Sequence, residues 1–314
     1  MDKNQKLILI ALIGGGLFVG CLVIILAVVF LLPTIRNRNL AQAVLPATPV
    51  VTIPPVIATT PPLVSQPTQT EALPPSTPTN QPPPTTEALP AVTYEGVSFS
   101  IPPGVAQSVT PGSIPAAPGD PANSFPGDVY PAYLEFAFND YALTGTFHKP
   151  KLMVYPAKEY AAMDPNAAQI IVKLGQVLQE KPTEVKNLPF LPLWNAAQFM
   201  QANIRYLDFQ NGSGVRFLTQ YGQAAWPINN KDMFYTFQGL TSDGNWYVAA
   251  IFPASHPSLP YDDQTVPGGD PAAFAENFTN YLAQVEPQLS ALPDDSFTPS
   301  LAALDAMVQS LQVK

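Results

Sequence analysis

The chain has 314 residues and carries 14 Lys and Arg against 23 Asp and Glu, a formal net charge of −9 at pH 7. Residues 93–314 hold 10 of the basic and 20 of the acidic side chains, so they offer no basic surface for phosphates, and nucleic-acid binding is disfavoured. The one cysteine, Cys21, leaves the rest of the chain without a disulfide, a thiolate nucleophile or a cysteine metal ligand.

An unbroken run of 26 apolar or glycine residues occupies positions 7–32. A helix needs about 20 such residues to cross a bilayer core, so the run predicts a transmembrane helix. A cleaved signal peptide and a lipoprotein signal acylated at Cys21 are the alternatives, but the first has a shorter apolar core and the second would leave an apolar stub. We therefore expect residues 1–6 to be a short tail and residues 7–32 to be an uncleaved signal anchor in the lipid bilayer.

The flanking charges do not orient this helix, because Lys3 and Lys6 on one side balance Arg36 and Arg38 on the other. The nearly uncharged stretch that follows suits the outside of a cell. We therefore expect a single-pass protein of the cell membrane, with its N-terminus inside and its C-terminal domain outside. The lack of disulfides in an exported domain of this size favours a bacterial or archaeal surface protein over a eukaryotic secreted one.

The predicted membrane helix contains a GxxxG spacing formed by Gly16 and Gly20. Two small residues four positions apart let helix backbones approach closely in lipid, so the spacing predicts a homodimer. The alternative is that glycine is simply common in membrane helices.

Residues 33–92 read as a linker. Positions 39–92 contain 14 prolines and 10 threonines but only two charges, and the string TEALP occurs at 70–74 and again at 86–90. Such a composition has no periodic apolar residues with which to bury a core, so we expect a disordered Pro/Thr-rich tether.

Residues 93–314 combine segments with strand periodicity and segments with helix periodicity. Pro, Gly and Ala dominate residues 102–128, which we expect to be mostly loop. An Asn-Gly-Ser-Gly turn at 211–214 and a Ser-Asp-Gly turn at 242–244 predict two hairpins. The predicted strands are 97–101, 131–138, 151–155, 196–209, 215–221, 234–238 and 245–252.

Three helices are predicted, each with an Asp-Pro or Thr-Pro pair at its start. They begin at Asp164, Asp270 and Thr298, and Pro287 should break or kink the second. Strands cluster in the middle of the segment and helices follow them. This order favours one globular α+β domain, an antiparallel sheet packed with helices.

Four segments carry a resemblance to known domains. YEGVSFSIPPG at 94–104 and GLTSDGNWYVAAIFP at 239–253 resemble the edges of PsbP-like or Mog1-like α/β/α sandwich domains. LPFLPLWNAAQ at 188–198 and RYLDFQNGSGVRFLTQYGQ at 205–223 look like segments of uncharacterised bacterial membrane-anchored ectodomains. The resemblance implies a sandwich over residues 93–312, from which the long loop at 102–128 departs. It implies no single function, because PsbP-like domains serve assorted binding and scaffolding roles.

No recognised catalytic, nucleotide-binding or metal-binding motif occurs in the chain, so we expect neither enzyme activity nor a cofactor. His148 and His256 are interpreted as loop residues at strand ends. The alternative is an envelope hydrolase that uses loop carboxylates. Loop carboxylates could also bind Ca²⁺, although solvated loops or charge at a helix start explain them equally well. The carboxylates in question are Asp120, Asp128, Asp262, Asp263, Asp294 and Asp295.

Trp194 and Trp226 lie in Pro-containing connections, where an exposed ring could line a groove for a peptide or sugar. The alternative is packing in the core. We expect a non-enzymatic domain that binds an extracellular ligand or protein at the cell surface. A structural or sensory ectodomain that dimerises through the membrane helix is a third hypothesis.

Overall fold

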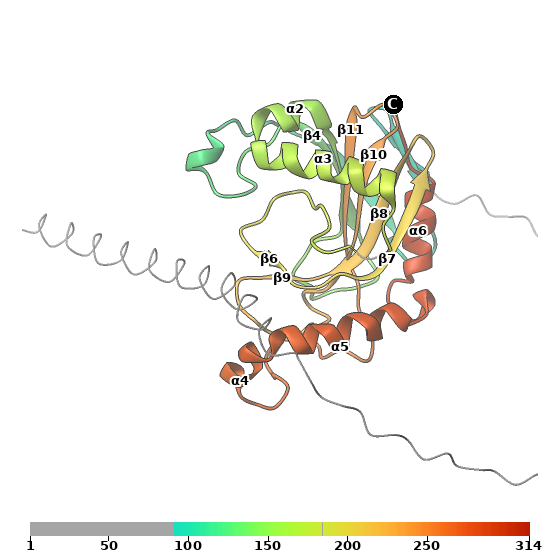
Figure 1. Ribbon diagram of the computed structural model, residues 1–314. Helices are drawn as coiled ribbons and strands as arrows, with labels where there is room; N and C mark the ends of the chain where they lie inside the picture. Colours follow the sequence, from blue (N-terminus) through green and yellow to red (C-terminus); the bar gives the residue numbers. More distant parts are fainter. Residues whose placement is uncertain (1–90, 184) are drawn as a thin grey trace, which may run out of the picture. The chain divides into compact units, whose positions relative to one another are not determined.

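The structure is a computed structural model that describes residues 91–314 apart from residue 184 (Figure 1). The predicted tail, the membrane helix with Gly16 and Gly20, and nearly all of the Pro/Thr-rich linker lie outside the described residues. Within the part of the chain that is described, no helix is both long and apolar enough to cross a membrane. The first strand begins at Ala91, slightly before the expected domain boundary at residue 93.

A seven-stranded antiparallel sheet lies at the centre of this region, in the order β3-β4-β5-β11-β10-β8-β7. Its strands are β3 (Ser108–Ile114), β4 (Tyr133–Asn139), β5 (Lys151–Pro156), β7 (Ala202–Phe209), β8 (Gly212–Thr219), β10 (Phe234–Thr241) and β11 (Trp246–Pro253). Both hairpins predicted from turn residues are present, as β7–β8 and β10–β11. The α+β class with a large antiparallel sheet is confirmed.

Two smaller sheets accompany the large one. β1 (Ala91–Tyr94), β2 (Val97–Ser100) and β12 (Gln312–Val313) join the two ends of the described region, and β6 (Ala197–Gln198) pairs with β9 (Tyr221–Gly222). The α-helices are α2 (Ala157–Met163), α3 (Pro165–Glu180), α4 (Pro271–Glu276), α5 (Phe278–Ala291) and α6 (Leu301–Gln309). Two single 3-10 turns, η1 (Pro121–Asn123) and η2 (Asp294–Ser296), lie in connections.

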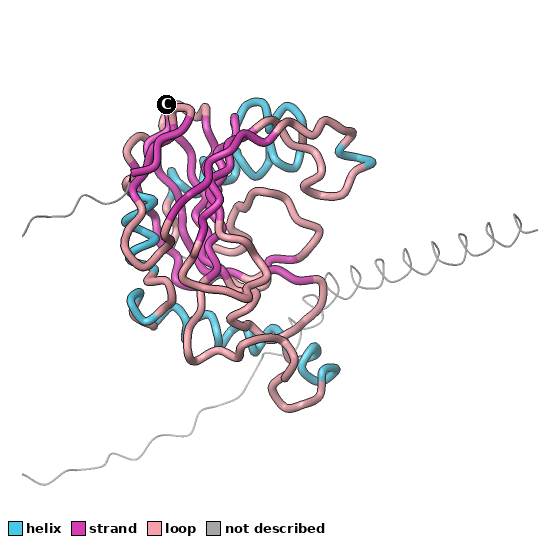
Figure 2. Tube along the Cα trace, turned by 180° about the vertical axis from the view of Figure 1, so that it is seen from behind, coloured by secondary structure: helices cyan, strands magenta, loops and turns pink. Residues whose placement is uncertain are grey.

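Alternation along the strands gives the sheet two apolar faces. Ala249 and Ile251 of β11 pack with α2 and α3, whereas Ala250 and Phe252 pack with α6 and with β2. Figure 1 shows α2 and α3 together on one side of the strands and α6 on the other, with α5 running past the end of the sheet. Figure 2 shows the strands from behind as one twisted stack, from which the long loops extend.

Two local predictions from the sequence were wrong, and a third was incomplete. Residues 102–128 are mostly loop as expected, but they also contain strand β3, whose Pro111 is tolerated because β3 is an edge strand of the sheet. The expected strand at 196–209 is divided into β6 and β7 by residues 199–201, and Asn203, with a positive φ of 53°, lies inside β7 where the register with β8 shifts. The second helix is interrupted at Asn277, and Pro287 lies inside α5 without ending it.

A buried charge network ties α6 and η2 to the sheet. The side chain of Arg216 on β8 is 0% exposed, and its guanidinium lies 3.3 Å from Asp294 and 3.1 Å from Asp305. Arg205 on β7 reaches Asp294 at 2.5 Å from the solvent side. Tyr235 donates its hydroxyl proton to Asp305 at 3.1 Å. Asp294, one of the candidate carboxylates, is therefore held in a structural ion pair.

Candidate functional site

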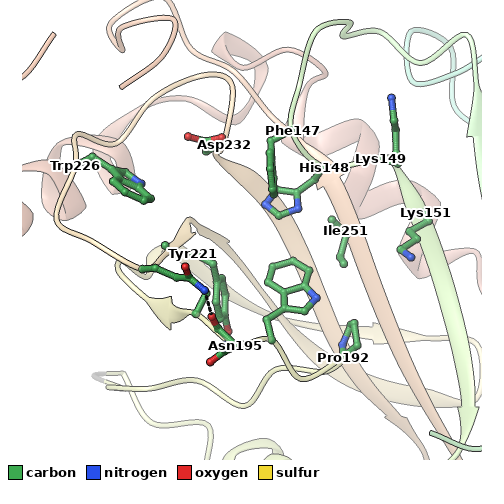
Figure 3. Close-up of a pocket in the computed structure, with 14 residues that line it drawn as sticks. Phe147, His148, Lys149, Lys151, Pro192, Asn195, Tyr221, Trp226, Asp232 and Ile251 are labelled. Atoms are coloured by element: carbon green, nitrogen blue, oxygen red, sulfur yellow. Dashed lines mark hydrogen bonds between the residues drawn. The ribbon is translucent and has the colours of Figure 1, made fainter. Parts of the chain in front are cut away.

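A cavity of about 680 Å³ lies on the side of the sheet that α2 and α3 cover (Figure 3). Its volume is within the range of pockets that hold small organic ligands. Three connections enclose it, β4–β5, α3–β6 and β9–β10, and Ile251 of β11 lies behind them. The lining residues are Phe147, His148, Lys149, Lys151, Pro192, Trp194, Asn195, Ala196, Tyr221, Gly222, Gln223, Trp226, Asp232 and Ile251.

One wall of the cavity is built around the half-buried Trp194. The imidazole of His148 stacks on the indole, with ring centroids 4.9 Å apart and planes 5° apart. Phe190 and Tyr221 lie 4.8 and 4.9 Å from the same indole, and Phe234 lies 5.6 Å from it. These separations are typical of favourable stacked and edge-to-face pairs. The five rings therefore fix one another, and the wall is formed before any ligand arrives.

His148 is kept neutral by its position in this wall. Burial is the main cause that lowers the pKa of its imidazole to about 4, and the positive charge of Lys151 acts in the same direction. A neutral imidazole stacks on Trp194 without the cost of desolvating a charge. At neutral pH the wall is therefore an uncharged aromatic surface.

The stability of the domain should depend on His148 between pH 6.5 and pH 4. Because the folded-state pKa is lowered, the unfolded chain binds the proton first, and folding is progressively penalised as the pH falls through this window. Relative to a His148→Phe variant, which cannot take up the proton, the natural protein should lose about 3 kcal/mol of unfolding free energy between pH 7 and pH 4. Parallel denaturation curves at the two pH values measure this. A constant difference between the two proteins would contradict the assignment.

Trp226 lies at the end of the cavity away from Lys151 (Figure 3). Phe199 packs edge-to-face against its ring, with centroids 6.3 Å apart. The short pairing of β6 with β9 holds the connection of Trp194 beside the connection of Trp226. Two backbone segments distant in the sequence are thereby fixed on either side of one cavity.

The charged groups around the cavity balance one another. The Lys151 ammonium lies 3.0 Å from the carboxylate of Glu135. The Asp232 carboxylate accepts a hydrogen bond from the Asn229 amide at 3.0 Å, and Lys149 is exposed at the rim. Because these ammonium and carboxylate groups carry opposite charges, the cavity has no excess of either sign and suits an uncharged ligand.

The structure brings the two tryptophans singled out in the sequence, Trp194 and Trp226, to the same cavity, each half-buried. His148, interpreted from the sequence as a loop residue, joins them through its stacking on Trp194. His256 lies elsewhere, where it is buried with its Nδ1 atom 2.7 Å from the Ser258 hydroxyl. That contact explains His256 as a residue that holds its own loop.

The loop carboxylates of the hydrolase hypothesis do not meet in this cavity, where Asp232 is the one carboxylate among the lining residues. Each of these loop carboxylates has a local partner instead. Asp120 caps η1, Asp128 accepts a hydrogen bond from the backbone N–H of Phe125, and Asp262 and Asp263 accept hydrogen bonds from Gln264. Asp294 pairs with Arg216, and Asp295 accepts a hydrogen bond from the Ser300 hydroxyl. In the described residues, no group of three or more His, Cys, Asp or Glu is placed to hold a metal ion.

Several lining residues were not singled out in the sequence. Phe147 and Pro192 enter the cavity from the β4–β5 and α3–β6 connections, Tyr221 enters it from β9, and Phe147 is 70% exposed. The available signal for Phe147 was an aromatic residue in a connection, whereas Tyr221 lies in a predicted strand and could not be told from a core residue. Comparisons of the chain with protein-family models, with curated proteins and with solved structures find no match.

Proposed function

We propose that residues 91–314 form a non-enzymatic binding domain whose ligand is a small uncharged molecule with an apolar ring face. The observation that carries this proposal is the preformed cavity of about 680 Å³ between Trp194 and Trp226, with amide and carboxylate groups at its rim. Flat aromatic walls favour a flat apolar ligand surface, and rim groups such as Asn195 and Asp232 can set its orientation.

The proposed setting of this domain is the outer surface of a cell membrane. The apolar run at 7–32 would anchor the chain, and the Pro/Thr-rich segment at 33–92 would hold the domain away from the bilayer. A domain held in this way would meet ligands of the surroundings or of the cell envelope. The net negative charge of residues 93–314 agrees with an uncharged rather than an anionic ligand.

Ligand-observed NMR on the full chain, in a detergent without a sugar headgroup, tests this proposal. The probes are indole, the methyl glycosides of common pyranoses, and a proline dipeptide. We expect saturation transfer to at least one of them, and loss of that signal by at least tenfold in a Trp226→Ala variant. Trp226 is half-buried, so the variant should remain folded.

A matched control is Trp246→Ala, because Trp246 packs against the opposite apolar cluster of the domain, away from the cavity. Binding that survives Trp226→Ala, or the absence of binding by every probe, would contradict the proposal. Turnover of a bound glycoside would instead favour the hydrolase hypothesis.

A further inference from the structure

A second pocket of about 300 Å³ adjoins the aromatic cavity. Lys151, Pro192 and Trp194 line both, so the two hollows meet along a shared border. The second pocket differs in chemistry because its far side consists of tyrosines rather than of indole and imidazole rings. These are Tyr130, Tyr133, Tyr155 and Tyr160.

One hydroxyl in this second pocket has no partner. The side chain of Tyr160 is 0% exposed, yet its hydroxyl makes no hydrogen bond. The backbone of Leu193 is close enough to affect the pKa of Tyr160, but no atom meets the geometry of a hydrogen bond with the hydroxyl. A buried hydroxyl left unpaired costs free energy, whereas a ligand oxygen in the adjoining pocket would satisfy it.

The tyrosine hydroxyls of the second pocket are hydrogen-bond donors at physiological pH. Burial is the main cause that raises the pKa of Tyr133 to about 12, and burial likewise raises the pKa of Tyr160. Both groups keep their protons, and Tyr133 lies 3.5 Å from a carboxylate oxygen of Glu135.

The border of the second pocket is held in place by a close backbone approach. Gly127 has a positive φ of 92°, and a Cβ atom there would lie 2.2 Å from the carbonyl oxygen of Leu193. Only glycine fits this position. The connection that carries Gly127 is thereby packed against the connection that carries Trp194, and the second pocket is as preformed as the first.

We propose that the two pockets are consecutive subsites for a neutral oligosaccharide, an inference that rests on the proposed function of the aromatic cavity. A pyranose ring has an apolar face of C–H groups and hydroxyls around its edge. The aromatic cavity offers flat rings together with the amides of Asn195 and Gln223 for one sugar. The tyrosine pocket then takes the hydroxyls of the next sugar, with Tyr160 donating to one of them.

The charges at both subsites fit this ligand better than an ionic one. Lys151, at the shared border, is neutralised by Glu135 at 3.0 Å, and Asp128 and Asp232 contribute one carboxylate to each pocket. A charged polysaccharide would find no cluster of opposite charge in either pocket.

The test compares sugars of increasing length on the full chain, again in a detergent without a sugar headgroup. Calorimetric titrations use monosaccharides and the matching trisaccharides of the neutral gluco, N-acetylglucosamine, manno and galacto series. In at least one series the trisaccharide should bind at least tenfold more tightly than its monosaccharide. Tyr160→Phe should weaken the trisaccharide by about 3- to 10-fold, the effect of one lost hydrogen bond, and leave the monosaccharide unchanged.

Tyr206→Phe is the matched control, because the Tyr206 hydroxyl donates to the Pro182 carbonyl outside both pockets. Its trisaccharide affinity should equal that of the natural protein. Tyr160→Phe removes no hydrogen bond from the free protein and takes away an unpaired buried hydroxyl, so its thermal unfolding temperature should be equal to or higher than that of the natural protein. This separates a lost ligand contact from a loss of structure.

The results also separate the two proposals. If no trisaccharide binds more tightly than its monosaccharide, or if Tyr160→Phe has no effect, the second subsite is wrong, although ring binding lost in Trp226→Ala would still support the aromatic cavity. If no sugar binds and a synthetic peptide of residues 70–90 does, the ligand is a proline-rich peptide and the oligosaccharide inference fails.

Discussion

Replacing Arg216 with alanine should lower the unfolding free energy of the domain by about 3–5 kcal/mol, because it leaves buried carboxylates without their cation. Arg216 is fully buried on β8, and its Nη2 atom lies 3.3 Å from both oxygens of Asp294. Its Nε atom lies 3.1 Å from Asp305, at ion-pair distance but without the angle of a hydrogen bond. The Asn203 side chain accepts a further hydrogen bond at 2.7 Å.

The effect of this substitution should depend on pH. Burial already raises the pKa of the Asp305 carboxyl, and Arg216 opposes that rise. Without the guanidinium, the pKa should rise further, so Asp305 can be accommodated as a neutral acid at low pH but not at neutral pH. An acid with a raised folded-state pKa loses stability as the pH increases. The deficit of Arg216→Ala should therefore be larger at pH 7 than at pH 5.

Arg205→Ala is the control, since Arg205 also pairs with Asp294 but its side chain is 51% exposed. An exposed ion pair contributes about 0–1 kcal/mol, so the control should be nearly as stable as the natural protein. Tryptophan fluorescence during chemical denaturation of the full chain measures both variants, because all three tryptophans lie in residues 91–314. Equal losses for the two variants would show that burial of the guanidinium is not the deciding factor.

Local chemistry explains which parts of the fold the sequence predicted. The β7–β8 and β10–β11 hairpins follow from turn residues a few positions apart, including Gly244 with its φ of 66°. Helix α3 follows from the Asp164 cap, whose carboxylate accepts a hydrogen bond from the backbone N–H of Asn166. Each of these signals lies within a few residues of the structure that it determines.

Long-range pairing explains what the sequence did not predict. β3 has Pro111 and Gly112 at its centre and its sequence is typical of a loop, but its register with β4 is supplied by residues 19 to 31 positions away. The network of Arg216 with Asp294 and Asp305 joins three separate elements. The hydrophobic periodicity of a single segment cannot indicate an ion pair between segments that are far apart in the sequence.

The candidate site was predicted only in part for the same reason. Trp194 and Trp226 stood out individually because they lie in connections, where a large ring is not required by strand alternation. Their common cavity depends on the two-residue pairing of β6 with β9, which is too short to carry a pattern. The role of His148 depends on its stacking on Trp194, 46 positions further along the chain, so no local pattern around His148 indicates it.

Replacing Trp194 with alanine should raise the pKa of His148 from about 4 towards the ordinary value of 6.5. The indole covers one face of the imidazole at a centroid distance of 4.9 Å, and its removal admits water to that face. Since burial is the main cause of the lowered pKa, hydration should restore part of the stability of the charged form. NMR titration of the imidazole signals measures the change directly.

Trp194→Ala should also abolish sugar binding at both pockets, because Trp194 lines the aromatic cavity and the tyrosine pocket alike. Trp226→Ala should weaken binding without moving the pKa of His148, since Trp226 is not among the rings that contact the imidazole. If the His148 pKa stays near 4 in Trp194→Ala, the imidazole is buried by Phe147, Phe234 and the backbone instead, and Trp194 is not the residue that forms the wall.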